Sequence, residues 1–575
     1  MPETAPLLAA LLSIPAGSRY PTLDLSPLRL KERTVAALVD RVLALARQKP
    51  VLFVVEDAHW IDPSSEELIA LAIDRLHEAP LLLVITHRPN YTPPWSGRSH
   101  VTMLMLNRLS RLQAGEMVRE LATDSVLSAD TVTEIVSKTD GVPLFIEELT
   151  KAMLESGLRT DGSGTRPHGS SPQLTVPSTL QDTLVARLDR TAETREVAQT
   201  AAVLGRDFSE ALLGAVSSLS RKTLTRALDD LVQAGLLLRQ ASAPETRYVF
   251  KHALVQDAAY GTLLSSVRQH LHARTAAAIE RDFPEVADAQ PELLAYHYGA
   301  AGIHDHAIAS WRRSAARARD RSNYVEAERH LATAIELVPQ LPEEDRKRTE
   351  LDLQMALGAV YRALRGSGSP HTEQTYARAR ALCEEVGDAD QLLEVIYGQF
   401  ISVFNRPKLH DAERIAKEFF QIAERNDKSA ALQVGYQLRG LAAFLLGDLQ
   451  LARNNLEACL RTEGLDPSEL KRFSHGQHPS SALTYLSWAL FALGYPEQAR
   501  ATRRRSRRPK VHFFMPWRSE MAAVCTKCGE ISGRSRKTSQ CCSTSRPIRA
   551  LWCFTGSDAF FRAGLALVAV PWTRE

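Results

Sequence analysis

The apolar residues of this chain change their spacing along its length. Two short runs near the N-terminus, Val51–Val55 and Leu81–Ile85, are continuously apolar, which is typical of strands buried in a parallel sheet. Between them, apolar residues recur at helical spacing, at Leu68, Leu71, Ala72 and Leu76. The pattern predicts a right-handed strand–helix–strand unit, because its links are short.

The helix of this unit has a recognisable start. Asp62 is followed by Pro63, which is favoured in the first turn of a helix. Ser64 and Glu67 have the spacing of a capping box. We therefore expect the helix to begin here, with Ser64 as its cap.

The middle of the chain changes from loop to helix and then to strand. Residues 156–177 are rich in glycine, proline and serine, which predicts a flexible linker. Residues 178–188, 191–204 and 221–231 have helical spacing, and Gly235 ends the last of these. Residues 236–239 and 247–250 then form an expected hairpin. Helices followed by a hairpin predict a winged-helix arm over residues 178–285.

The C-terminal half has a helical pattern from Pro291 to about Arg500. Three similar phrases begin near Asn323, Gly447 and Gly494, each with a tight turn before a helix that carries Ala and Arg. Such phrases are typical of tetratricopeptide-like hairpins, here at irregular spacing. We expect a solenoid over residues 286–502 that binds a protein partner on its concave face and that offers a surface for self-association. The alternative is a plain helical bundle.

The helical pattern stops within a repeat, and residues 503–575 are basic and rich in cysteine. Cys525 and Cys528 have zinc-ligand spacing, but the adjacent Cys541 and Cys542 do not complete a zinc ribbon. We expect no zinc and no native core in this segment. Out-of-frame translation of a GC-rich gene explains its composition; a disordered basic tail and a zinc module are the alternatives.

Composition narrows the classes of function. The chain has 575 residues, a net charge of +3 and a mean hydropathy of −0.19, which gives no general attraction to nucleic acid or to membranes. The helix over residues 221–235 carries Arg221 and Lys222 but also Asp229 and Asp230, so it has no continuous basic face for DNA. Seven unevenly placed cysteines and a start without a basic leader favour a reducing, cytoplasmic location.

Polar residues that could bind a ligand or take part in catalysis follow both predicted strands. Glu56 and Asp57 come directly after the first strand, and Thr86-His87-Arg88 follows the second. Ligands of open α/β sheets bind at the carboxyl ends of strands. A pair of acids there can hold the water shell of Mg²⁺ and polarise an attacking water. The simpler alternative is that the acids cap the following helix.

The run from Glu56 to Pro63, E-D-x-H-W-x-D-P, resembles the Walker B region of STAND-type signalling ATPases. Within that class it is most similar to the bacterial proteins that carry an adenylate/guanylate cyclase domain. The resemblance covers about Leu11 to Arg500. It implies a mixed, mostly α chain: a truncated α/β P-loop ATPase remnant over residues 1–155, a winged helix and a solenoid. It implies Mg²⁺ and ATP or ADP as ligands. No lysine follows a glycine, so G-x-x-x-x-G-K-[ST] is absent. We expect a C-terminal piece of such a protein, without its cyclase domain.

The same resemblance implies roles for single residues. Asp57, through water, would hold Mg²⁺, with Glu56 beside it, and Arg88 would sense the γ-phosphate. In the motif Gly141-Val142-Pro143, the proline would pack on adenine; a plain helix–turn–helix junction is the alternative. His252 would contact the β-phosphate as a latch, or else cap a helix. Without a phosphate loop we expect weak nucleotide binding and no ATP hydrolysis. The alternative function is a non-catalytic helical-repeat scaffold.

Overall fold

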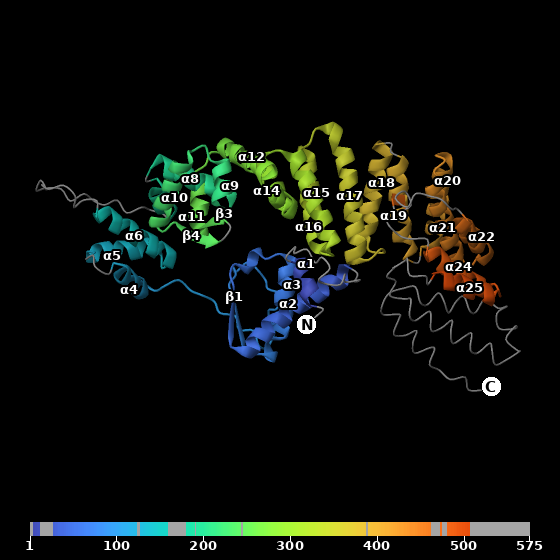
Figure 1. Ribbon diagram of the computed structural model, residues 1–575, viewed down its shortest axis with the longest axis horizontal. Helices are drawn as coiled ribbons and strands as arrows, with labels where there is room; N and C mark the ends of the chain where they lie inside the picture. The colour runs from blue at the N-terminus through green and yellow to red at the C-terminus, as the bar shows by residue number, and fades with distance from the viewer. Residues whose placement is uncertain are drawn as a thin grey trace, which may run out of the picture. The chain divides into compact units, whose positions relative to one another are not determined.

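The computed structural model describes residues 4–11, 27–122, 127–158, 180–189, 191–242, 245–386, 389–406, 408–461, 472–473 and 480–506. The protein is mostly α-helical, as its sequence predicts (Figure 1). It divides into two compact units, Met1–Ser314 and Ala315–Glu575.

The first unit opens with two helices and a two-stranded sheet. α1 (Thr4–Leu11) packs on α2 (Pro27–Gln48). β1 (Val51–Val55) pairs in parallel with β2 (Leu81–Ile85), and the bounds of both strands are the predicted ones. α3 (Pro63–Asp74) joins the strands, with the short 3₁₀ turns η1 (Ala58–Trp60) and η2 (Leu76–Glu78) at either side. The predicted strand–helix–strand unit is therefore confirmed.

The burial expected for these two strands is wrong on one face. Phe53, Val55 and Leu83 are part-buried, and Val55 and Leu83 pack with the apolar side of α3. On the opposite face, Leu52, Val54, Leu82 and Val84 are 40 to 64% exposed. A continuous apolar run fits a strand covered on both faces, but among the described residues only one face has a covering layer.

The cap of α3 also differs from the expected one. The N-cap is Asp62, whose Oδ1 accepts hydrogen bonds from the backbone N–H groups of Ser64 and Ser65, both at 3.0 Å. Burial would raise the pKa of Asp62, but hydrogen bonds from the Ser65 side chain and from the Ser65 and Ser64 backbone outweigh it and lower the pKa. Ser64 is therefore inside the first turn, because Pro63 takes the first helical position and the residue before it becomes the N-cap.

A three-helix bundle follows the sheet. It consists of α4 (Arg111–Leu121), α5 (Ala129–Thr139) and α6 (Pro143–Leu158), around a core that includes Val118, Ile135 and Ile146. α6 takes in residues 156–158 of the predicted linker, and the rest of that linker lies outside the described residues.

The next part of the first unit is a helix–hairpin module with one large core. Its elements are α7 (Leu180–Leu188), α8 (Ala192–Leu204), β3 (Asp207–Ser209), α9 (Glu210–Val216), α10 (Arg221–Gln233), β4 (Leu237–Ser242), β5 (Glu245–Phe250) and α11 (Ala253–Gly261). The expected hairpin is β4–β5, and β3 adds a third antiparallel strand in the order β3-β5-β4. β3 and α9 were not predicted, because a three-residue strand has too little apolar pattern to be seen.

Further helices complete this unit. α12 (Ser265–Asp282) packs on α14 (Pro291–Ala301), with the short α13 (Pro284–Ala289) between them. α15 (His304–Asp320) crosses the boundary between the two units.

The second unit is a row of helices in which each packs on the next (Figure 1). The helices are α16 (Tyr324–Leu337), α17 (Glu343–Arg365), α18 (Pro370–Val386), α19 (Ala389–Phe404), α20 (Leu409–Arg425), α21 (Ser429–Leu446), α22 (Leu449–Arg461), α24 (Ser480–Ala492) and α25 (Pro496–Ser506), with the 3₁₀ turn η3 (Val338–Gln340) after α16. The three recurring phrases of the sequence begin α16, α22 and α25. Such stacking of neighbours is the arrangement of a helical solenoid.

Glycines allow close helix packing in this row. A Cβ at Gly398 on α19 would collide with the ring of Tyr376 on α18, and one at Gly440 on α21 would lie 2.6 Å from Leu456 Cγ on α22. Small residues at such points are what helical repeats require.

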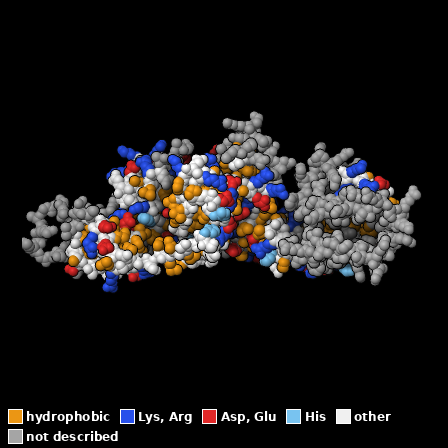
Figure 2. Space-filling model, turned by 90° about the horizontal axis from the view of Figure 1, so that it is seen from below, with side chains coloured by type: hydrophobic (Ala, Val, Ile, Leu, Met, Phe, Trp, Pro, Cys, Tyr) orange, Lys and Arg blue, Asp and Glu red, His pale blue; other side chains and the backbone are white. Residues whose placement is uncertain are grey.

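The last described helix includes Arg503, Arg504 and Arg505, which the sequence had assigned to the tail. Cys525, Cys528, Cys541 and Cys542 lie outside the described residues. Among the residues that the structure describes, no helix has both the length and the apolar character needed to span a membrane. On the face drawn in Figure 2, basic, acidic and apolar side chains are interspersed, in line with the small net charge.

Candidate functional site

The carboxyl ends of β1 and β2 are joined through the backbone of Asp57. Asp57 has a left-handed backbone, with φ of 55°. Its N–H donates to Thr86 Oγ1 at 3.0 Å, and the N–H of Ala58 donates to the Thr86 carbonyl at 2.8 Å. A non-glycine residue in this conformation is held there by its surroundings and is typical of functional turns. The structure thus brings Asp57 and the residues after β2 together, as predicted.

The two acids of this turn do not cap a helix through their side chains. Glu56 is exposed and Asp57 is partly exposed. Asp57 occupies the N-cap position of η1 but makes no side-chain cap hydrogen bond, and α3 is capped by Asp62. The capping alternative is therefore wrong for both acids.

Asp57 has an ion-pair partner that the sequence did not predict. Nη1 of Arg206 lies 3.3 Å from Asp57 Oδ2. Arg206 immediately precedes β3 and lies 149 positions after Asp57 in the chain. No local pattern links residues so far apart, so neither spacing nor composition could have revealed this contact.

Arg88, the expected sensor, lies in the same region. Its guanidinium carbon is 5.6 Å from the centre of the Trp60 ring, which is a cation–π distance. Trp60 belongs to the turn directly after the two acids. Arg88 is exposed.

Gly141 and Pro143 have structural roles at the turn before α6. Gly141 has φ of 69°, and a Cβ there would collide with the carbonyl oxygen of Leu109. Its own carbonyl accepts a hydrogen bond from the Leu109 N–H at 2.8 Å. Pro143 begins α6. These contacts agree with a helix–turn–helix junction. The packing of Pro143 on adenine stays a prediction.

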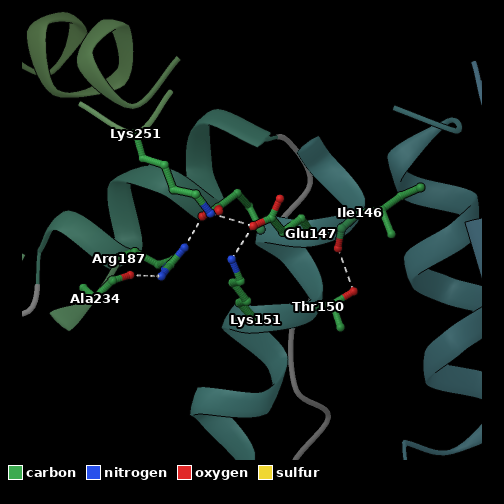
Figure 3. A network of polar contacts seen from close by, with 8 residues as sticks. Ile146, Glu147, Thr150, Lys151, Arg187, Ala234 and Lys251 are labelled. Carbon is green, nitrogen blue, oxygen red and sulfur yellow. Dashed lines mark hydrogen bonds and ion pairs between the residues drawn. The ribbon is translucent and has the colours of Figure 1, made fainter. Parts of the chain in front are cut away.

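The first turns of α6 carry a charged network that ties the bundle to the helix–hairpin module (Figure 3). Glu147 Oε1 accepts hydrogen bonds from Lys151 and, at 2.9 Å, from Lys251, which follows β5. Burial would raise the pKa of Glu147, but the two lysines outweigh it and lower the pKa to about 2.

The neighbouring acid, Glu148, is 1% exposed and forms an ion pair with Arg187 of α7, which is 5% exposed. Arg187 also donates to the carbonyl of Ala234 at the end of α10. This buried pair therefore joins α6 to two helices of the module.

His252 adjoins this network. Its ring nitrogen lies within 4.8 Å of the carboxylates of Glu147 and Glu148. It occupies the N-cap position of α11, as the capping alternative expects, but its side chain makes no cap hydrogen bond. Burial, and then the charge of Lys251, lower its pKa, and its buried Nε2 has no hydrogen-bond partner among the described residues. A neutral imidazole is therefore available for one further contact.

The two clusters are connected through Arg206. Its backbone carbonyl accepts the N–H of Phe250 at 2.9 Å, and Phe250 is two residues before His252. The predicted residues thus form two groups, one at Asp57 and one at His252, and Arg206, Lys251 and Glu147 are the functional candidates that the sequence did not reveal.

The donor atoms of these groups decide which cation fits. Mg²⁺ is held in proteins by one or two carboxylates with several waters. Asp57, with Glu56 beside it, fits such a water-rich site because both acids are accessible. Glu147 and Glu148 already neutralise three cationic side chains, so with His252 they make a poor metal site.

Comparisons with known proteins place the chain as follows. No family model matches it. An uncharacterised protein of Rhizobium meliloti (strain 1021) is 27% identical over an alignment of 496 residues, and the match covers 83% of this chain and 46% of the relative. The chain thus spans about half the length of that relative.

Among solved structures, the chain is similar to a Signal Transduction ATPase with Numerous Domains (STAND) protein with a tetratricopeptide repeat sensor from Pyrococcus horikoshii. The TM-score is 0.30 at 12% identity, over 94% of this chain and 81% of the other. At that score the two folds are not shown to be the same.

Proposed function

We propose that this chain is part of a nucleotide-responsive regulatory protein, in which the Asp57 site responds to a Mg²⁺–nucleotide and the helical row binds a protein partner. The observation that carries the proposal is the strained turn at Asp57, which presents a carboxylate where two parallel strands end. The arrangement of Arg88 and His252 at the two clusters supports the same reading.

The chemistry available to the site is binding rather than turnover. Asp57 would hold the water shell of Mg²⁺, and Arg88 and His252 would face the phosphates. The metal would neutralise phosphate charge when bound. Phosphoryl transfer also needs a lysine and a row of backbone N–H donors around the phosphates. The sequence supplies no Gly-Lys pair for them, so the chain as it stands binds nucleotide weakly and does not hydrolyse it.

A steady-state phosphate-release assay tests this point. The chain and its Asp57→Asn variant are expected to show the same background rate in ATP and Mg²⁺. Activity in the chain that disappears in the variant would contradict the absence of turnover.

A second function has its own observation in its favour. The helical row of the second unit packs each helix on its neighbours. A non-catalytic scaffold that uses only these helices is therefore the alternative. Partner binding that is unaffected by nucleotide and by Asp57→Asn would favour the scaffold.

A further inference from the structure

Asp57 and Arg206 form a contact between two parts of the first unit that are far apart in the sequence. Asp57 lies two residues after β1 of the parallel sheet, and Arg206 immediately precedes β3 of the helix–hairpin module. Both side chains are about 40% exposed, so the ion pair is neither locked in a core nor fully solvated.

The backbone at both ends of the pair is fixed. Asp57 is held by the hydrogen bond from its N–H to Thr86 Oγ1. Arg206 is held by the bond between its carbonyl and Phe250, in the middle strand of the three-stranded sheet. The side chains therefore meet because two rigid elements present them, and moving one element past the other would break the contact.

The guanidinium takes the place of a cation at this carboxylate. Asp57 Oδ2 accepts from Arg206 Nη1, and a divalent ion with its water shell cannot share that position with a guanidinium. Arg206 also has a buried Nε with no acceptor among the described residues. An arginine in this state satisfies its donors incompletely, so it has hydrogen bonds to gain from a new anionic partner.

We propose that Arg206 is a positioning residue that competes with a divalent cation for Asp57. When the cation is absent, Arg206 holds Asp57 and ties the module to the sheet. When the cation binds with a phosphate ligand, Arg206 is released from the carboxylate and becomes a donor for phosphate oxygens. The backbone hydrogen bond between Phe250 and Arg206 places this release one and two residues from Lys251 and His252.

This inference rests on the proposed function, since it assumes that Asp57 binds a cation. It identifies Arg206 as the residue that competes with that cation. It also makes cation binding and the contact between the two parts mutually exclusive. Linkage then requires that removing the arginine strengthens the binding of the cation.

The test is the affinity of the full chain for Mn²⁺ alone, followed by the electron paramagnetic resonance signal of free Mn²⁺. Replacing Arg206 by alanine is expected to tighten Mn²⁺ binding about two- to fivefold, which is the range that a half-exposed ion pair supports. Arg206→Lys keeps the charge and should lie between the wild type and Arg206→Ala. Asp57→Asn should weaken binding at least about tenfold, since it removes the carboxylate.

Arg195→Ala is the matched control. Arg195 forms a half-exposed pair with Asp189 in the same module, at 3.5 Å. Its removal changes the charge by the same amount without touching Asp57, so Mn²⁺ affinity should stay at the wild-type value.

The possible results separate the two claims. Binding that needs Asp57 but is equal in wild type and Arg206→Ala would leave the proposed site standing and overturn the competition. Binding that no variant shows, even Arg206→Ala, would overturn both. Hydrogen exchange without any ligand gives a second readout: Arg206→Ala should speed exchange of the Ala58 and Phe250 amides. Faster exchange without tighter Mn²⁺ binding would show a purely structural tie and would also overturn the competition.

Discussion

Glu148 is buried, with 1% of its surface exposed, and its carboxylate forms an ion pair with Arg187. A buried ion pair adds little net stability compared with apolar residues, but losing one partner leaves the other charged and desolvated. This pair, between α6 and α7, ties the bundle to the helix–hairpin module beside the pair of Glu147 and Lys251.

Replacing Arg187 by alanine is therefore expected to lower the free energy of unfolding by about 3–5 kcal/mol. The exposed control Arg195→Ala should lower it by less than about 1 kcal/mol. Urea unfolding followed by circular dichroism measures both. Equal, small effects would show that Glu148 finds water or another partner when Arg187 is removed.

Two buried histidines predict a response to acid. His272 and His297, on α12 and α14, have their Nδ1 atoms 2.9 Å apart, and His272 Nε2 lies 3.0 Å from the hydroxyl of Tyr260. Burial lowers the pKa of both; Arg268 adds to the effect for His272, to about 4, and His272 adds to it for His297, to about 3.

The pKa of each histidine is lower in the folded chain than in the unfolded chain. Below about pH 6.5 the unfolded chain therefore binds more protons at these histidines than the folded chain does. The contribution of the two histidines to stability should be constant above that pH and should fall below it, down to about pH 4 for His272 and about pH 3 for His297, by up to about 1.4 kcal/mol per pH unit for each. Urea midpoints measured across this range test it. His297→Gln should flatten the curve, and a substitution at the exposed His270 should not.

At the residue scale, contacts within the strand–helix–strand unit could be predicted from the sequence, and contacts between distant segments could not. The acids after β1 and the residues after β2 could be brought together because parallel strands end at one edge. The cap of α3 was expected at Ser64 and lies two residues earlier, at Asp62. Arg206 had no signal at all, since its contact with Asp57 comes from packing between distant elements.

At the scale of elements, the open face of β1 and β2 stands out. Leu52, Val54, Leu82 and Val84 form a contiguous apolar strip at the surface. Residues 103–106, Met-Leu-Met-Leu, add four side chains that are 61 to 93% exposed. Exposed apolar surface of this kind on an unpaired sheet promotes association between chains.

Changing Leu82 and Val84 together to threonine should therefore reduce self-association at little cost in stability, because both side chains are already exposed. Leu83→Thr, on the covered face, is the control and should destabilise the fold. Sedimentation velocity at several concentrations measures association. An unchanged distribution of species in the double variant would show that this face takes no part in it.

Element types were easier to predict than their environment. Strand bounds followed from apolar runs flanked by polar residues, and α16, α22 and α25 followed from their starting phrases. The exposure of one strand face could not follow, because a run of valine and leucine looks the same whether one face or both are covered. β3 was too short for any pattern.

At the scale of the whole molecule, the helical row should be a folding unit of its own. Its contacts join neighbouring helices, so they do not need distant parts of the chain. A fragment of residues 322–506 is expected to be strongly helical and to melt cooperatively by circular dichroism. A disordered spectrum would mean that these helices depend on the first unit.

The central claim is that Asp57 belongs to a site that binds nucleotide with Mg²⁺ and does not turn it over. Calorimetric titration of the full chain with ADP and Mg²⁺ tests this most directly. The account predicts a dissociation constant of roughly 0.1–1 mM, weakened beyond detection in Asp57→Asn and without Mg²⁺. Binding that is the same in Asp57→Asn, or no binding to the chain at all, would contradict it.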